Sequence, residues 1–91
     1  MIFEIDIPPE VGQAIRHLPP DIKKSVKEAL RALSEEPHLG TPLRKELAGF
    51  WRYRVRRYRI VYAIDRASQL LRIYAVGHRK GLYEKLTADR H

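Results

Sequence analysis

The 91-residue sequence contains no cysteine, so neither a disulfide framework nor a thiolate metal site is available to it. Long apolar runs are also missing. No segment approaches the roughly 18 consecutive apolar residues of a membrane-spanning helix. The opening ten residues carry acids among the first six and do not resemble a signal peptide. We therefore expect a cytoplasmic protein with no membrane partner.

Acidic residues are scarce in the second half of the chain. Residues 50–91 contain 11 lysines and arginines against 3 acids, whereas residues 1–49 contain 7 against 8. Nine of those 11 basic residues are arginines, whose guanidinium groups pair with phosphate through two parallel hydrogen bonds. This distribution favours a nucleic-acid partner, and an acidic protein is the alternative that charge alone leaves open.

The basic excess is densest at 50–62, FWRYRVRRYRIVY, which holds five arginines and no acid. Successive side chains of a strand point to opposite faces. Trp51, Tyr53 and Val55 are therefore expected in the core, and the opposite face is expected to carry Arg52, Arg54 and Arg56. Such a face suits an anionic ligand, and a solvent-exposed sheet face without a ligand is the simpler alternative.

Hydrophobic periodicity, prolines and glycines divide the chain into short elements. We expect a strand at 2–7, helices at 8–18 and 20–36, a loop at 38–49 with one helical turn at 43–47, strands at 50–56, 58–64 and 70–76, and a short helix at 81–86. The expected buried residues of the helices and of the second central strand are Val11, Ala14, Ile15, Leu18, Ile22, Val26, Ala29, Leu30, Leu33, Tyr58 and Tyr62. Helices on one face of an antiparallel sheet make an α+β two-layer domain, here a single domain spanning 1–91.

Three segments carry a resemblance to a known family. LPPDIKKSVKEALRAL at 18–33, LAGFWRYRVRRYRIVY at 47–62 and VGHRKGLY at 76–83 resemble the RelE/ParE superfamily of prokaryotic type II toxins, nearer its RelE branch. The resemblance covers nearly the whole chain. It implies a RelE-like fold with an N-terminal strand, an antiparallel helix hairpin, a three-stranded antiparallel meander and a short C-terminal helix.

The resemblance also implies a function. RelE-like toxins cleave mRNA in the ribosomal A site, without a metal or any other cofactor, and a cognate antitoxin holds them inactive. A ribose 2′-hydroxyl attacks the adjacent phosphate and the 5′-oxygen leaves, so the site needs cations and proton carriers. The implied catalytic residues are Arg52, Arg54, Arg59, His78, Arg79 and Tyr83, with further RNA contacts from Arg56, Arg57 and Lys80.

The proton carriers are the open part of this assignment. Some family members have lysines on the central strand where this chain has arginines, and an arginine does not act as a base. That leaves His78, whose imidazole exchanges protons near neutral pH, and Tyr83. His17, His38 and His91 are scattered and predict no metal site.

Two other functions share these patterns. A ParE-like toxin would inhibit DNA gyrase by binding, without nuclease activity. An inactive relative would retain only the binding of an antitoxin or a nucleic acid. The combination of the central arginines with Arg79 and Tyr83 favours the ribonuclease.

Overall fold

The computed structural model describes residues 2–78. Its elements are β1 (Glu4–Asp6), α1 (Pro9–Arg16), α2 (Pro20–Glu35), η1 (Pro37–Leu39), β2 (Thr41–Pro42), η2 (Lys45–Leu47), β3 (Trp51–Val55), β4 (Tyr58–Asp65) and β5 (Leu70–Gly77). The helix expected at 81–86 lies outside the described residues. None of the described helices is long and apolar enough to cross a membrane.

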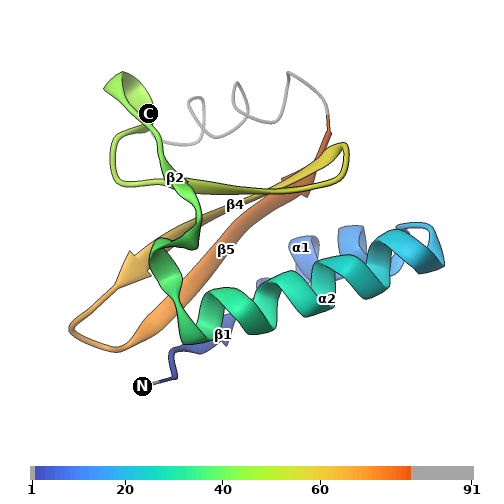
Figure 1. Ribbon diagram of the computed structural model, residues 1–91, viewed down its shortest axis with the longest axis horizontal. Coiled ribbons are helices and arrows are strands. Elements are labelled where there is room, and N and C mark those ends of the chain that lie inside the picture. Colours follow the sequence, from blue (N-terminus) through green and yellow to red (C-terminus); the bar gives the residue numbers. More distant parts are fainter. Residues whose placement is uncertain (1, 79–91) are drawn as a thin grey trace.

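The five strands form one sheet in the order β1-β5-β4-β3-β2, with α1 and α2 against one face (Figure 1). Strands β3, β4 and β5 make the expected antiparallel meander. Strand β1 pairs with β5 in parallel, and the two-residue strand β2 pairs with β3. The α+β two-layer fold is confirmed. The sequence predicted neither β2 nor the place of β1, because both depend on pairing partners that are distant along the chain.

The helices bury the expected stripes except at Ala14, which is exposed, and at Leu18, which is half-buried. Each begins at a proline, which is tolerated in a first turn because that position has no intrahelical hydrogen bond to lose. All five residues expected in the core from α2 are buried. In α1, Val11 and Ile15 are buried but Ala14 is exposed, so its predicted burial is wrong. Val11 and Ile15 lie one turn apart and are the two buried residues of this eight-residue helix, and Ala14 lies to one side of them.

Apolar side chains gather on both faces of the sheet. The larger cluster joins α1 and α2 to the sheet and includes the fully buried Leu33, Ile60 and Tyr62. A smaller cluster, centred on Phe50 and Val61, lies on the face away from the helices, which we call the outer face. Because alternate residues of β3 and β4 face these two clusters, each strand has a helix-facing parity and an outer parity.

A β-bulge in β5 enlarges the outer cluster. Val61 pairs with Ala75 but Tyr62 pairs with Ile73, so Tyr74 is an extra residue in β5. The bulge lets Tyr74 meet the ring of Phe50 edge-on, with ring centroids 4.9 Å apart. The alternating sequence of the first strand did not show which of its faces is buried. In the structure Phe3 and Ile5 pack against the core, whereas Ile2 is 69% exposed.

Candidate functional site

Three of the predicted arginines share the outer face of β3 and β4. Arg54 lies directly opposite Arg59 in the strand pair, and Arg52 lies opposite Val61, a member of the outer cluster. Like charges that face each other across a strand pair repel and destabilise the sheet unless an anion lies between them. This register therefore brings together three guanidinium groups whose mutual repulsion a bound anion would relieve.

These arginines line a pocket of about 290 Å³ at the edge of the sheet where β2 joins β3. Its lining residues are Leu39, Gly40, Thr41, Arg52, Tyr53, Arg54 and Arg59. We call it the arginine pocket and its side formed by Leu39, Gly40 and Thr41 the 39–41 wall. The volume is close to the lower end of ligand pockets, roughly 300 Å³, and suits a phosphate with part of its nucleotide.

The pocket arginines have no carboxylate partner among residues 2–78. The salt bridges in that range join Arg56 to Asp21, at 3.2 Å, and Arg72 to Asp65, at 4.0 Å. Arg54 Nε donates a hydrogen bond of 2.9 Å to the carbonyl oxygen of Arg56. That bond orients the guanidinium of Arg54 and uses only one of its three nitrogens. The positive charge of the pocket is thus available to a ligand.

Arg56 does not belong to this arginine row. Val55 pairs with Tyr58, so Arg56 and its neighbour Arg57 form a two-residue turn. Arg56 has a φ of 56°, in the left-handed region that few non-glycine residues occupy, and its guanidinium contacts Asp21 in the first turn of α2. The prediction that Arg56 shares a face with the other strand arginines is wrong because the strand ends at Val55.

A buried tyrosine holds the 39–41 wall against β3 and β4. The hydroxyl of Tyr62 donates to the carbonyl oxygen of Pro37 at 2.6 Å and accepts from the N–H of Gly40 at 3.2 Å. Burial raises the pKa of Tyr62 to about 12, so the hydroxyl keeps its proton and both bonds persist at neutral pH. The sequence predicted that Tyr62 is a core residue, but the loop that it anchors lies more than 20 residues away along the chain.

His78 lies at the end of β5, beyond the Arg59–Gly77 pair. Its ring stacks on Tyr58 with centroids 4.9 Å apart and an interplanar angle of 3°. Tyr58 packs against the helix-facing cluster, so the parity of the stack is opposite to that of Arg59. The structure therefore does not bring His78 into the arginine pocket. Arg79, Lys80 and Tyr83 lie outside the described residues.

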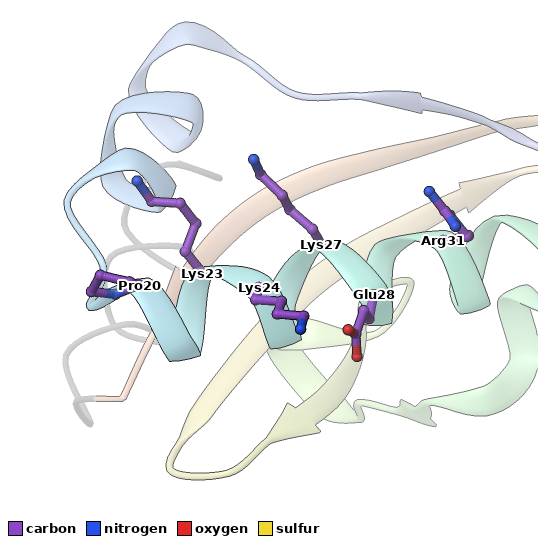
Figure 2. A pocket seen from close by; sticks show the side chains of 6 residues that line it. All are labelled: Pro20, Lys23, Lys24, Lys27, Glu28 and Arg31. Atoms are coloured by element: carbon purple, nitrogen blue, oxygen red, sulfur yellow. The ribbon is translucent and has the colours of Figure 1, made fainter.

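A second basic surface lies on α2. A groove of about 460 Å³ is lined by Pro20, Lys23, Lys24, Lys27, Glu28 and Arg31. In Figure 2 the side chains of Lys23, Lys27 and Arg31 extend to the same side of α2, one turn apart. No role for these residues was predicted from the sequence. Among residues 2–78, no group of three or more histidines and acids is arranged to hold a metal ion.

Comparison with known proteins decides the family. The family model described as the ParE toxin of the type II toxin–antitoxin system parDE matches residues 9–83. The chain belongs to the RelE/ParE superfamily of type II toxins. This toxin is 41% identical over 73 residues to toxin RelG of Mycobacterium tuberculosis, a match that covers 78% of this chain and 84% of RelG.

Solved structures of similar toxins have the same fold. The crystal structure of the toxin–antitoxin complex RelBE2 of Mycobacterium tuberculosis contains a chain that is 36% identical to this toxin. Their TM-score is 0.79, covering 87% of this chain and all of that one. A mutant of the E. coli toxin RelE in the free state superposes with a TM-score of 0.81 at 20% identity, over 99% of this chain and 98% of that one. The likeness at 20% identity concerns the fold alone.

Proposed function

We propose that this toxin is an endoribonuclease that cleaves mRNA in the ribosomal A site, and that its arginine pocket binds the scissile phosphate. The observation that carries the proposal is the convergence of Arg52, Arg54 and Arg59 on one pocket without a carboxylate partner among the described residues. The relatedness to RelG and to the RelBE2 toxin supports the RelE branch. The catalytic unit is the single domain 1–91.

The pocket suits the charge that develops during the cleavage. When a 2′-hydroxyl attacks the phosphate, negative charge grows on the non-bridging oxygens, and the 5′-oxygen must take up a proton as it leaves. Guanidinium groups fixed in advance stabilise that charge more in the transition state than in the ground state. We assign this role to the three pocket arginines, with Arg79 as a fourth cation. No metal or other cofactor is required by this scheme.

Proton transfer needs a group other than the pocket arginines. We keep His78 and Tyr83 as the candidates, His78 at the end of the sheet and Tyr83 beyond the described residues. Since His78 stacks on the helix-facing side of Tyr58, an RNA strand would have to pass around the end of β4 and β5 to meet both this imidazole and Arg59. Arg57 lies in the exposed turn between β3 and β4. We assign it, together with Lys80, to contacts with such a strand.

The partner that controls this activity is an acidic antitoxin. The RelBE2 structure is that of a toxin–antitoxin complex, which supports the same kind of partner here. The net charge of +7 means that an acidic segment can approach favourably over long range. An antitoxin that covers the arginine pocket would remove the anion site and the cleavage activity together.

The groove on α2 gives the toxin a second contact with ribosomal RNA. The Lys27→Glu variant is expected to weaken binding to ribosomes at least fivefold, because it replaces an attraction to phosphate by a repulsion. Affinity for 70S ribosomes, measured by sedimentation at several salt concentrations, checks this. Glu28→Lys, at the neighbouring position of the same groove, is the matched control and should bind as tightly as the wild type or more tightly. Equal binding by the Lys27→Glu variant would exclude α2 from the contact.

In vitro translation combined with primer extension along the mRNA tests the proposed function. We expect new 5′ ends within codons that appear only when ribosomes, mRNA and toxin are all present. Intact mRNA with undisturbed translation would contradict the proposal. The match to the ParE family model makes inhibition of DNA gyrase the second candidate, which a supercoiling assay tests. An inactive relative would give no effect in either assay.

A further inference from the structure

The 39–41 wall of the arginine pocket has no regular secondary structure of its own beyond single turns and a two-residue strand. Leu39 ends η1, and Thr41 begins β2. Connecting segments are more mobile than the helices and strands they join, so the position of this one depends on its contacts with the sheet. The wall supplies three of the seven residues that line the pocket, so a movement of the wall changes the space beside Arg52, Arg54 and Arg59.

We propose that Tyr62, acting through Gly40, is a positioning residue that holds the 39–41 wall at the distance that RNA binding requires. The inference rests on the proposed function of the arginine pocket. One hydroxyl makes two bonds to the same short segment, at Pro37 and at Gly40, on either side of Leu39. Pro37 lies two residues before the wall and Gly40 lies within it, so these two attachments fix the position of the wall and the direction in which the chain enters it.

Gly40 is the contact point of this attachment. A side chain there would overlap the carbonyl oxygen of Arg52 and the hydroxyl of Tyr62. The backbone at Gly40 therefore packs directly on β3, at the residue whose guanidinium lines the pocket. Thr41 continues the attachment by pairing with Arg52 in the sheet. Any outward movement of the wall at Gly40 changes the space beside Arg52.

The ring of Tyr62 has separate support. It stacks on Trp51 with centroids 6.4 Å apart, and Trp51 in turn meets His38 edge-on at 5.2 Å. The Tyr62 side chain is fully buried in the helix-facing cluster. Phenylalanine would keep these ring contacts and lose only the two hydrogen bonds. The Tyr62→Phe variant thus separates the attachment of the wall from the packing of the core.

The test measures binding and turnover separately. Binding is measured to ribosomes programmed with an mRNA whose A-site codon carries 2′-deoxyriboses, which removes the attacking hydroxyl. Tyr62→Phe is expected to raise the dissociation constant about fivefold to tenfold and the KM for cleavage of ordinary mRNA by a similar factor, with kcat within twofold of the wild type. Ile60→Val, a small change to a fully buried neighbour on the same strand, is the control for lost stability and should leave the dissociation constant within twofold.

A second variant addresses the same wall from the other side. Gly40→Ala pushes the backbone away from Arg52 and from the Tyr62 hydroxyl, so it should weaken binding to a similar extent. In the double variant the fold increase in the dissociation constant should be smaller than the product of the two single increases, because both changes release the same segment. Independent effects, or a lower melting temperature of Tyr62→Phe with unchanged binding, would overturn the proposal.

The wild type separates this inference from the proposed function. Binding of the wild type to the deoxy-substituted complex without cleavage of ordinary mRNA would overturn the proposed function alone, and the effect of Tyr62→Phe on binding would still test the wall. Failure of the wild type to bind would overturn both.

Discussion

Replacement of Arg59 by alanine is expected to reduce ribosome-dependent mRNA cleavage by about 100-fold to 1,000-fold, the loss seen when one fixed donor to a developing oxyanion is removed. Arg59 lies opposite Arg54 and lines the same pocket, so it contributes both charge and hydrogen bonds at one place. The fold should survive, because removal of one of two facing cations relieves repulsion in the sheet. The measurement is the single-turnover cleavage rate on programmed ribosomes.

The matched control for this variant is Arg72→Ala. Arg72 pairs with Ala63, on the outer parity of the same sheet, but it lies outside the pocket and forms a salt bridge with Asp65. The Arg72→Ala variant changes the net charge of the toxin by the same amount as Arg59→Ala. Its cleavage rate should stay within about twofold to threefold of that of the wild type. Binding of the cognate antitoxin should persist in both variants. Equal activity of Arg59→Ala and the wild type would remove Arg59 from the site.

Replacement of Leu33 by alanine is expected to cost about 3 kcal/mol of unfolding free energy, since truncating a fully buried leucine leaves a cavity that the core only partly fills. Leu33 is in the last turns of α2, in the cluster that joins the helices to the sheet. For a domain of this size the change corresponds to a fall in melting temperature of about 15 °C. Urea denaturation followed by circular dichroism measures it.

Leu39→Ala is the matched control, because the same atoms are removed from a side chain that is 46% exposed. We expect a stability change below about 0.5 kcal/mol. A loss at Leu39 as large as that at Leu33 would mean that the 39–41 wall contributes as much to the stability of the domain as the interface between α2 and the sheet. Since Leu39 lines the arginine pocket, this variant can still affect the binding of RNA.

The two basic surfaces of this toxin lie on different layers. The arginine pocket belongs to the sheet, at the β2–β3 edge. The groove with Lys23 and Lys27 belongs to α2 (Figure 2). A domain with separate cationic surfaces can contact a substrate strand and a larger RNA surface at the same time. Their distinct residues, arginine in one and mainly lysine in the other, allow each contact to be removed independently.

The sequence predicted most of the fold because local patterns encode it. Prolines mark the start of both helices, the helical spacing of Val26, Leu30 and Leu33 specifies the buried face of α2, and alternation in 51–55 separates the core residues from the arginines. The prediction from the sequence was wrong at Ala14, whose burial depends on how a short helix lies on the sheet. It was also wrong at Arg56, whose orientation depends on where the β3–β4 hairpin turns. Neither is written in the periodicity of one segment.

The candidate site was predicted in its composition and not in its arrangement. Strand alternation placed Arg52 and Arg54 on one face, but only the register of β3 with β4 set Arg59 opposite Arg54. His78 was predicted to share a site with the arginines of β3 and β4, but its ring stacks on Tyr58, whose parity is opposite to that of Arg59. One additional residue in a bulge or a turn would move the side chains that follow it to the opposite face of the sheet.

The sequence by itself determined the two layers, the family resemblance and a strand rich in arginine, because each depends on short-range spacing and composition. Tertiary structure alone decided that β1 lies beside β5, that the 39–41 wall closes the arginine pocket, and that the Tyr62 hydroxyl holds that wall. These contacts join segments more than ten residues apart, and the pairing of such segments is selected by the free energy of the whole packed domain rather than by any local preference.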